Sequence, residues 1–366
     1  MIKLASGLSL PENALREIFR CFRCGYCRSA CPTFAIKGSE SWNARGRLIL
    51  ARELIEGHVE PDKTILDRIF SCNSCGACEV VCPAVVRVVD ALTALKSALV
   101  ASGVKPPEPI VKIHEAILRH GNPFGRGQYQ EGPKEGKGEV LLFPGCVALE
   151  LEPGLIRAIE AILEAAEVPY SILEGPCCGS PLHNMGFKGD AERLAERLAS
   201  KIRSSSAEHV ITPCPMCLLA LRPYLGQRVE HTTTFMRKLM DEGRLVLKRK
   251  VGLKATYHDP CVLGRQLGIY EAPRELIWQS GLELLEMPRS RANSACCGYG
   301  YLNFMAYPEL AREMAKRRIL EALEVGVDVL ITACPSCLHA LSEAAREVAR
   351  ALAVSDVSEV IAELAT

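Results

Sequence analysis

Eighteen cysteines are the residues of this 366-residue chain that are best suited to chemistry. The first residues lack the long apolar run of an export signal, so we expect a cytoplasmic protein whose thiols stay reduced. In that setting a cysteine-dense sequence indicates bound metal rather than disulfides. The cysteines fall into clusters and none is isolated. The sequence therefore predicts that all eighteen bind metal.

The first eight cysteines form two runs of the type C-x2-C-x2-C-x3-C-P. Three closely spaced thiolates can hold three corners of an iron–sulfur cube, and the fourth, before proline, ligates the other cluster. Zinc also takes such pairs, but it needs two pairs of thiolates, whereas each run offers three plus one. We therefore expect two cubane [4Fe–4S] clusters, one held by Cys21, Cys24, Cys27 and Cys82, the other by Cys72, Cys75, Cys78 and Cys31.

The second half of the chain repeats itself. HVITPCPMCLLAL (209–221) matches VDVLITACPSCLHAL (327–341), and GPCCGSP (175–181) matches SACCGYG (294–300). Each repeat carries five cysteines in the same order, and we expect each set to hold one metal group. A structural zinc is the alternative for either set, although it would leave one thiol unused. The two sets are Cys146, Cys177, Cys178, Cys214 and Cys217, and Cys261, Cys296, Cys297, Cys334 and Cys337.

Four segments follow from these patterns. Residues 1–102 are expected to form a helical two-cluster ferredoxin domain, and residues 103–138 a Pro/Gly-rich linker that holds no long regular element. In the segments 139–244 and 252–366, short apolar runs alternate with amphipathic stretches. That alternation predicts an α/β fold with a short parallel sheet in each repeat.

This topology explains how distant cysteines could meet. Cys146, Cys214, Cys261 and Cys334 directly follow expected strands, and the carboxyl ends of parallel strands share one crevice. Proline after Cys214 and after Cys334 suits the first position of a helix, whose free N–H groups favour an anionic group. Glycine after each Cys-Cys pair allows a tight turn there.

The Cys-Cys-Gly motifs behind a helical ferredoxin module resemble the D-type catalytic subunit of heterodisulfide reductase and its relatives, over essentially the whole chain. The resemblance implies a noncubane [4Fe–4S] cluster in each complete five-cysteine motif, with these ten cysteines at the catalytic centre. It also implies cleavage of a disulfide in two one-electron steps. Relatives serve as iron–sulfur subunits of glycolate, lactate or glycerol-3-phosphate dehydrogenases, which is the alternative function.

One position departs from the family pattern, in which the leading cysteine of the second motif is commonly followed by histidine. Here Val262 follows Cys261. Disulfide cleavage needs protons as well as electrons, and a histidine beside the cluster is a natural donor. His258 or His183 could take that role, although a lone histidine near a strand end is more often structural.

The remaining sequence limits the partners. The net charge of +1 points to no nucleic acid, and no apolar run could cross a membrane, so we expect any membrane contact, at the inner face, to go through a partner. We find no nucleotide-binding glycine motif. A flavoprotein, a cytochrome b-type subunit or another redox subunit is therefore expected as partner, with a small disulfide or thiol as substrate.

Overall fold

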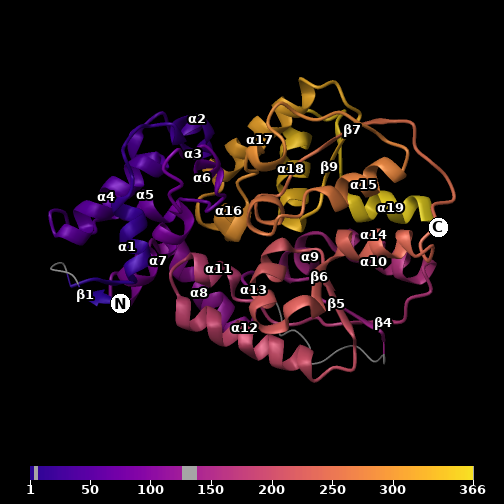
Figure 1. Cartoon of the computed structure of the whole chain (residues 1–366), viewed down its shortest axis with the longest axis horizontal. Coiled ribbons are helices and arrows are strands. Elements are labelled where there is room, and N and C mark those ends of the chain that lie inside the picture. The colour runs from indigo at the N-terminus through magenta and orange to yellow at the C-terminus, as the bar shows by residue number, and fades with distance from the viewer. Residues whose placement is uncertain (4–6, 126–137, 366) are drawn as a thin grey trace.

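The computed structural model describes residues 1–3, 7–125 and 138–365. Its amino-terminal part is helical apart from one antiparallel pair, β1 (Ile2–Lys3) and β2 (Ser9–Leu10). This helical module, indigo to purple in Figure 1, confirms the predicted character of the front of the chain. Its elements are α1 (Glu12–Phe19), α2 (Cys27–Ala30), α3 (Pro32–Lys37), η1 (Glu40–Trp42), α4 (Ala44–Glu56), α5 (Lys63–Phe70), α6 (Ala77–Val80) and α7 (Val88–Ala101).

The expectation that residues 103–138 hold no long element is wrong for their first half. Helix α8 (Glu108–His120) occupies thirteen of these residues. A proline lies in its first turn, where the missing N–H costs nothing, and Gly121 ends it in the left-handed conformation. Ile110, Ile113 and Ile117 are buried along one face. Proline and glycine therefore bound this helix instead of excluding it, and residues 126–137 lie outside the described residues.

Two four-stranded parallel sheets follow, and they have the same topology. The first is ordered β4-β3-β5-β6 and the second β10-β9-β7-β8, so that in the direction β8 to β10 the second reads 2-1-3-4, as the first does. Both sheets confirm the predicted α/β repeats. The strands are β3 (Val140–Leu142), β4 (Tyr170–Ile172), β5 (His209–Thr212), β6 (Val229–His231), β7 (Lys254–Tyr257), β8 (Glu283–Leu284), β9 (Val329–Thr332) and β10 (Ala353–Asp356).

Helices cover both sheets. In the first repeat they are α9 (Cys146–Leu151), α10 (Pro153–Ala165), α11 (Ser180–Asn184), α12 (Lys188–Arg203), α13 (Pro215–Leu225), η2 (Gly226–Arg228) and α14 (Thr232–Asp241). The second has η3 (Val262–Gln266), α15 (Glu271–Gln279), η4 (Arg291–Asn293), η5 (Gly300–Leu302), α16 (Asn303–Ala306), α17 (Pro308–Leu323), α18 (Pro335–Val348) and α19 (Val357–Ala365).

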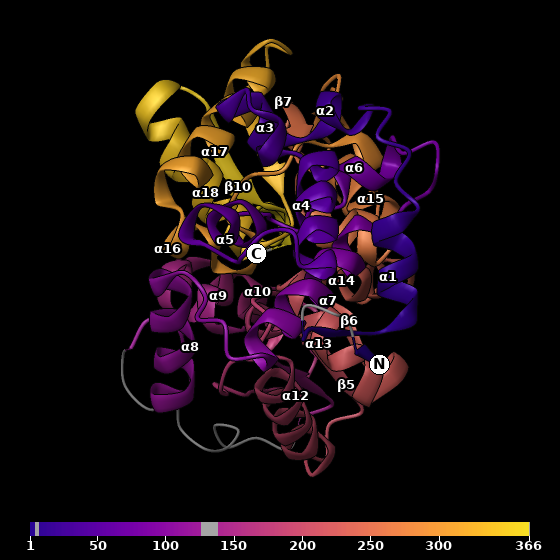
Figure 2. The same ribbon diagram turned by 90° about the vertical axis from the view of Figure 1, so that its left-hand side faces the viewer.

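The two repeats pack against each other in a symmetric way. Helix α10 of the first repeat contacts α19 of the second, and α15 of the second contacts α14 of the first. One apolar core includes residues of both sheets, such as Leu142 and Ile331. The front module lies beside both repeats, with α3 next to α17 and α7 next to α11 (Figures 1 and 2). Among the described residues, no helix is both long and apolar enough to cross a bilayer.

Candidate functional site

The fold places four of the ten repeat cysteines where strands end. Cys214 caps α13 after β5, and Cys334 caps α18 after β9. Cys146 is the first residue of α9 after β3, and Cys261 precedes η3 after β7. In each sheet the strand order reverses between the first and third strands, and a parallel sheet binds ligands at that point. The cysteines therefore stand at the two most favourable positions for a ligand.

In the first repeat the five cysteines come together. Cys177 hydrogen bonds with Cys146, and Cys178 with Cys217. A Cβ atom on Gly145 would lie 2.8 Å from Cys217 Sγ, so the chain leading to Cys146 passes directly over the Cys-Pro-Met-Cys turn. Thiol neighbours and desolvation raise the pKa of Cys217. Thiols packed this way stay neutral unless a cation such as iron balances their charge.

The second repeat gathers its cysteines in the same way. Cys297 Sγ lies 3.3 Å from Cys337 Sγ. Cys296 hydrogen bonds with Cys261, and Cys334 with Cys337. One further group belongs to this site, because a ring nitrogen of the buried His258 and the sulfurs of Cys297 and Cys337 all lie within 4.8 Å of one another.

Glycine after each Cys-Cys pair is required by the backbone. Gly179 has φ of +82° and Gly298 of +91°. A Cβ on Gly179 would lie 2.4 Å from Ala191 O, and one on Gly298 2.6 Å from Ala311 O. Each glycine thus lets the paired cysteines turn against the following helix, as the motif predicted.

The eight front cysteines separate into an inner and an outer group. Cys31, Cys72, Cys75 and Cys78 all line one cavity, which is the set expected to share a cluster. The outer group is more open: Cys24 is exposed, and Cys27 interacts with Cys21. Cys82 follows α6, which packs against α2, the helix that starts at Cys27.

Two arginines of the front module, Arg47 and Arg45, lie beside different groups of cysteines. Arg47 is buried, lines the cavity of the inner group and donates to Thr33 and Ser71. Arg45 lies near Cys21 and Cys27 and donates to Arg23 O at 2.9 Å. Each can thus offset negative charge at one of the two front sites.

The inner front group touches the second repeat. Cys75 hydrogen bonds with Cys296, which lowers the pKa of Cys75. Arg265 reaches the same place, because its Nε donates to Cys75 O at 2.6 Å and its charge acts on Cys261 and Cys296. A direct thiol-to-thiol contact therefore joins the front module to the back half of the chain.

A pair of asparagines holds this junction, and sequence analysis missed it. Asn184 Nδ2 donates to Ser74 Oγ at 2.6 Å, and Asn303 Nδ2 donates to Asn73 Oδ1 at 2.9 Å. Both asparagines are the sixth residue after a Cys-Cys pair, one in each repeat. The signal was therefore present in the aligned repeats. The two asparagines, one from each repeat, thus both bind the loop between Cys72 and Cys75.

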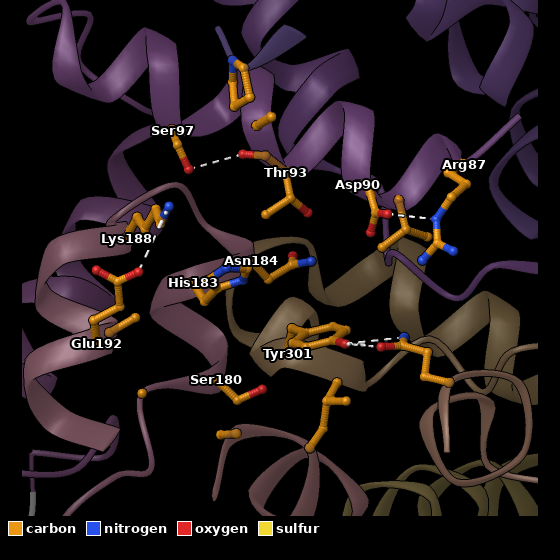
Figure 3. Close-up of a pocket in the computed structure, with 18 of the residues that line it drawn as sticks. Arg87, Asp90, Thr93, Ser97, Ser180, His183, Asn184, Lys188, Glu192 and Tyr301 are labelled. Atoms are coloured by element: carbon orange, nitrogen blue, oxygen red, sulfur yellow. Dashed lines mark hydrogen bonds and ion pairs between the residues drawn. The ribbon is translucent and has the colours of Figure 1, made fainter. Parts of the chain in front are cut away.

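A cavity of about 1290 Å³ opens between α7 and the helices α11 and α12 (Figure 3). Cys178 is part of its lining, with Tyr301 and His183. Tyr301 adopts a left-handed conformation, with φ of +53°, that is strained for a bulky residue, and such strain clusters at functional sites. Its hydroxyl bonds to Gln266 at 3.2 Å. Partial desolvation and the nearby Lys188 lower the pKa of His183.

Comparison with known proteins agrees with this geometry. A model of a cysteine-rich domain matches residues 140–222 and 255–342, and a model of a 4Fe-4S dicluster domain matches residues 17–86. The chain therefore carries a 4Fe-4S dicluster domain followed by two cysteine-rich domains. It is an iron–sulfur electron-transfer protein related to the D-type subunit of heterodisulfide reductase, as the resemblance implied.

Two curated relatives and one solved structure illustrate the relationship. The chain is 28% identical to the D chain of the dihydromethanophenazine:CoB--CoM heterodisulfide reductase of Methanosarcina barkeri, over 97% of this chain and 96% of that protein. It is 26% identical to the "Probable membrane-anchored ferredoxin" of Chromohalobacter salexigens, over 96% of this chain and 60% of that protein. A crystal structure of a hypothetical protein from Helicobacter pylori shares the fold, with a TM-score of 0.62 and 10% identity over 97% of this chain and 75% of that one.

Proposed function

We propose that this chain relays electrons through two cubane [4Fe–4S] clusters to a metal–sulfur group in each repeat, where a disulfide or heterodisulfide is reduced. The front clusters are held by the two interleaved sets of four cysteines, and the repeat groups by the two sets of five. The division into residues 1–102, 103–138, 139–244 and 252–366 is part of the same proposal.

The observation that carries it is the completeness of both five-cysteine sets at equivalent strand ends. A chain that only relayed electrons would not need five thiols in each repeat. The donor set also fits iron and sulfide, since thiolates are the ligands that these clusters take. When bound, such a group supplies electrons one at a time to a sulfur–sulfur bond.

The contact between Cys75 and Cys296 gives the route. It leads from the inner front group to the second repeat, and Cys214 and Cys334 lie close enough to interact across the two repeats. The outer front group, with its exposed Cys24, is the part of the relay open to a redox partner. That partner is a flavoprotein, a cytochrome b-type subunit or another redox subunit, and it alone would bring the chain to a membrane.

The cavity beside Cys178 is the substrate entrance. The step is R–S–S–R′ + 2 e⁻ + 2 H⁺ → R–SH + R′–SH, so the sulfur–sulfur bond breaks and each thiolate takes a proton. His183 is exposed to this cavity and lies on α11 shortly after Cys178 (Figure 3). It can pass protons from solvent to a thiolate. This is the role that a histidine at the position of Val262 could take in the family pattern.

A second function is favoured by Val262 itself, which is buried beside Cys261. Without a histidine there, the chain would serve as the electron-transfer subunit of a flavin-dependent glycolate-, lactate- or glycerol-3-phosphate-type dehydrogenase. In that case the repeats would transfer electrons without binding a thiol.

The test is electron paramagnetic resonance of the protein purified without oxygen, oxidised in the presence of small thiols. We expect a thiol-induced paramagnetic signal that Cys178→Ser weakens, because it removes the contribution of the first repeat, and that Thr234→Val, on α14 outside the cysteine motifs, leaves in place. A second measurement follows disulfide reduction with a reduced viologen dye. A protein with its full iron content that shows neither the signal nor reduction of any disulfide would support the electron-transfer subunit instead.

A further inference from the structure

Several side-chain donors of the second repeat are buried without a satisfied hydrogen bond in the described part of the chain, and three of them adjoin its cysteines. They are the Oγ of Ser336, the Nη2 of Arg265 and the Nε2 of His258, which has only the thiol of Cys297 beside it. Leaving a buried donor unsatisfied costs free energy, so donors that gather in one place need an acceptor there. All three residues adjoin the cysteines of the second repeat, and we refer to them as the donor set.

The orientation of His258 is fixed by its neighbour. Arg318 Nε donates to His258 Nδ1 at 3.1 Å, and a guanidinium can only donate. The neutral imidazole therefore accepts at Nδ1 and carries its hydrogen on Nε2. A neutral histidine in this form is a donor at Nε2, not a metal ligand, although Cys297 and Cys337 lie within 4.8 Å of the ring.

The other two donors lie at the same site. Ser336 stands between Cys334 and Cys337 in the Cys-Pro-Ser-Cys turn, and its side chain is buried. Arg265 donates its other N–H groups to Cys75 O, Ala292 O and Ser294 O, while its charge acts on Cys261 and Cys296. The donors thus come to the sulfur set from two separate parts of the sequence, the segment around Cys261 and the Cys-Pro-Ser-Cys turn.

The first repeat has no donor of this set at the equivalent positions. Counting from the leading cysteine and from the Cys-x-x-Cys turn, Phe143 replaces His258, Met216 replaces Ser336 and Glu150 replaces Arg265. Phe143 and Met216 are buried. Two sites with the same five cysteines therefore differ in the hydrogen-bond donors that surround them.

We propose that the donor set binds the sulfurs of the second repeat's metal–sulfur group and makes it more easily reduced than that of the first repeat. The inference rests on the proposed function. Added negative charge on a cluster is stabilised by hydrogen bonds to its sulfurs and by a nearby cation, which raises the reduction potential. The second repeat also contacts Cys75, so it is the site that receives electrons from the front module.

The experiment is a potentiometric titration of the full-length protein, followed by visible and paramagnetic spectra. Cys297→Ser identifies the reduction wave of the second repeat, because that wave should be absent from the variant. His258→Phe and Ser336→Ala should each move the second-repeat wave to more negative potential. A tenfold change in the one-electron equilibrium, about 59 mV, is the expected size for the pair combined.

Two sets of variants make the result decisive. Phe143→His and Met216→Ser place donors in the first repeat and should move its wave to more positive potential. Thr234→Val removes a hydroxyl that is also buried without a partner in the described part of the chain, but on α14 away from any cysteine motif, and should move neither wave. If His258→Phe fails to fold, Ser336→Ala and the first-repeat variants still test the proposal.

Failure of this inference can be told apart from failure of the proposed function. Two repeat waves of which neither responds, or a second-repeat wave that lies below that of the first, would overturn the inference and leave the proposed function standing. Absence of both repeat waves from the unaltered protein would overturn the proposed function itself. A spectroscopic signal of nitrogen bound to the metal that is lost in His258→Phe would also overturn the inference, because it would make His258 a ligand.

Discussion

The two repeats are built on one plan and differ in what surrounds their cysteines. Both have a four-stranded parallel sheet, a Cys-Cys-Gly turn with positive φ and a capped Cys-x-x-Cys helix. Around them, the first repeat has Phe143 and Met216 where the second has His258 and Ser336. The shared plan is the basis for proposing one kind of metal group in each repeat. The differences are the basis for proposing that the two groups have different roles.

The same contrast extends one layer of residues further out. In the second repeat Asp259 is buried and paired with Arg274, whereas the equivalent position in the first repeat is Pro144. Arg318 and Glu321 form a second ion pair beside His258. Apolar packing surrounds the cysteines of both repeats, and the second site has buried ion pairs in addition.

The largest effect should come from removing a cysteine of either repeat. Cys178→Ser and Cys297→Ser should each lower the iron content by about four atoms per chain, because each removes a ligand of one cluster. Metal analysis of protein purified without oxygen measures this. Loss of iron from only one of the two variants would break the comparison, since it would mean that just one repeat holds iron.

Arg274→Met should destabilise the second repeat strongly. Arg274 donates to Asp259 at 2.7 and 2.9 Å, and the substitution would leave that carboxylate buried and unpaired. We expect the free energy of unfolding to fall by about 3–5 kcal/mol, measured by urea denaturation. Arg237→Met, which removes solvent-accessible ion pairs with Asp241 and Glu275, should cost at most about 1 kcal/mol. Similar losses in both variants would contradict the contrast between the sites.

Gly179→Ala and Gly298→Ala should destabilise the two repeats about equally. Each adds a Cβ that meets backbone oxygen at 2.4 or 2.6 Å, on a residue with positive φ. We expect a loss of about 2–4 kcal/mol in each, read from thermal unfolding. Gly252→Ala, where an added Cβ meets nothing within 4 Å among the described residues, is the control. A loss in one variant alone would show that the shared turn is not equivalent.

Asn184→Ala and Asn303→Ala should have the smallest effect. Each removes one buried hydrogen bond to the loop at Asn73 and Ser74 and leaves its partner unsatisfied, which costs about 1–3 kcal/mol. Asn184→Ala also removes the acceptor of the buried Lys96 Nζ at 3.4 Å, so its loss should be the larger of the two. Urea denaturation of both single variants gives the values. Losses in both variants would sharpen the view that each repeat holds the front module, and a loss confined to one variant would contradict it.

The sequence predicted the α/β repeats and the iron–sulfur class of the protein because both signals are local. The front runs, the repeated motif and the strand–helix alternation all follow from neighbouring residues, and Cys31 indeed lies with Cys72, Cys75 and Cys78. The helix at residues 108–120 is not predicted because the prolines and glycines near its ends indicate a loop. Its isoleucines, however, recur with helical spacing.

The polar surroundings of the second repeat could not be predicted in the same way. Arg318, Arg265 and Asn303 act on cysteines and loops far away in the chain, and nothing in their local sequence shows where they point. Aligning the repeats would have revealed Asn184 and Asn303, and would have paired His258 with Phe143. Their meaning needs the fold, because only the fold shows that His258 is buried beside Cys297 and Cys337.

The most direct test of the four-cluster relay is quantification of iron, sulfide and zinc in protein purified without oxygen. We predict about sixteen irons per chain, four for each of four clusters, and no zinc. About eight irons with stoichiometric zinc would contradict the relay, because the repeats would then hold structural metal and could not pass electrons to a disulfide.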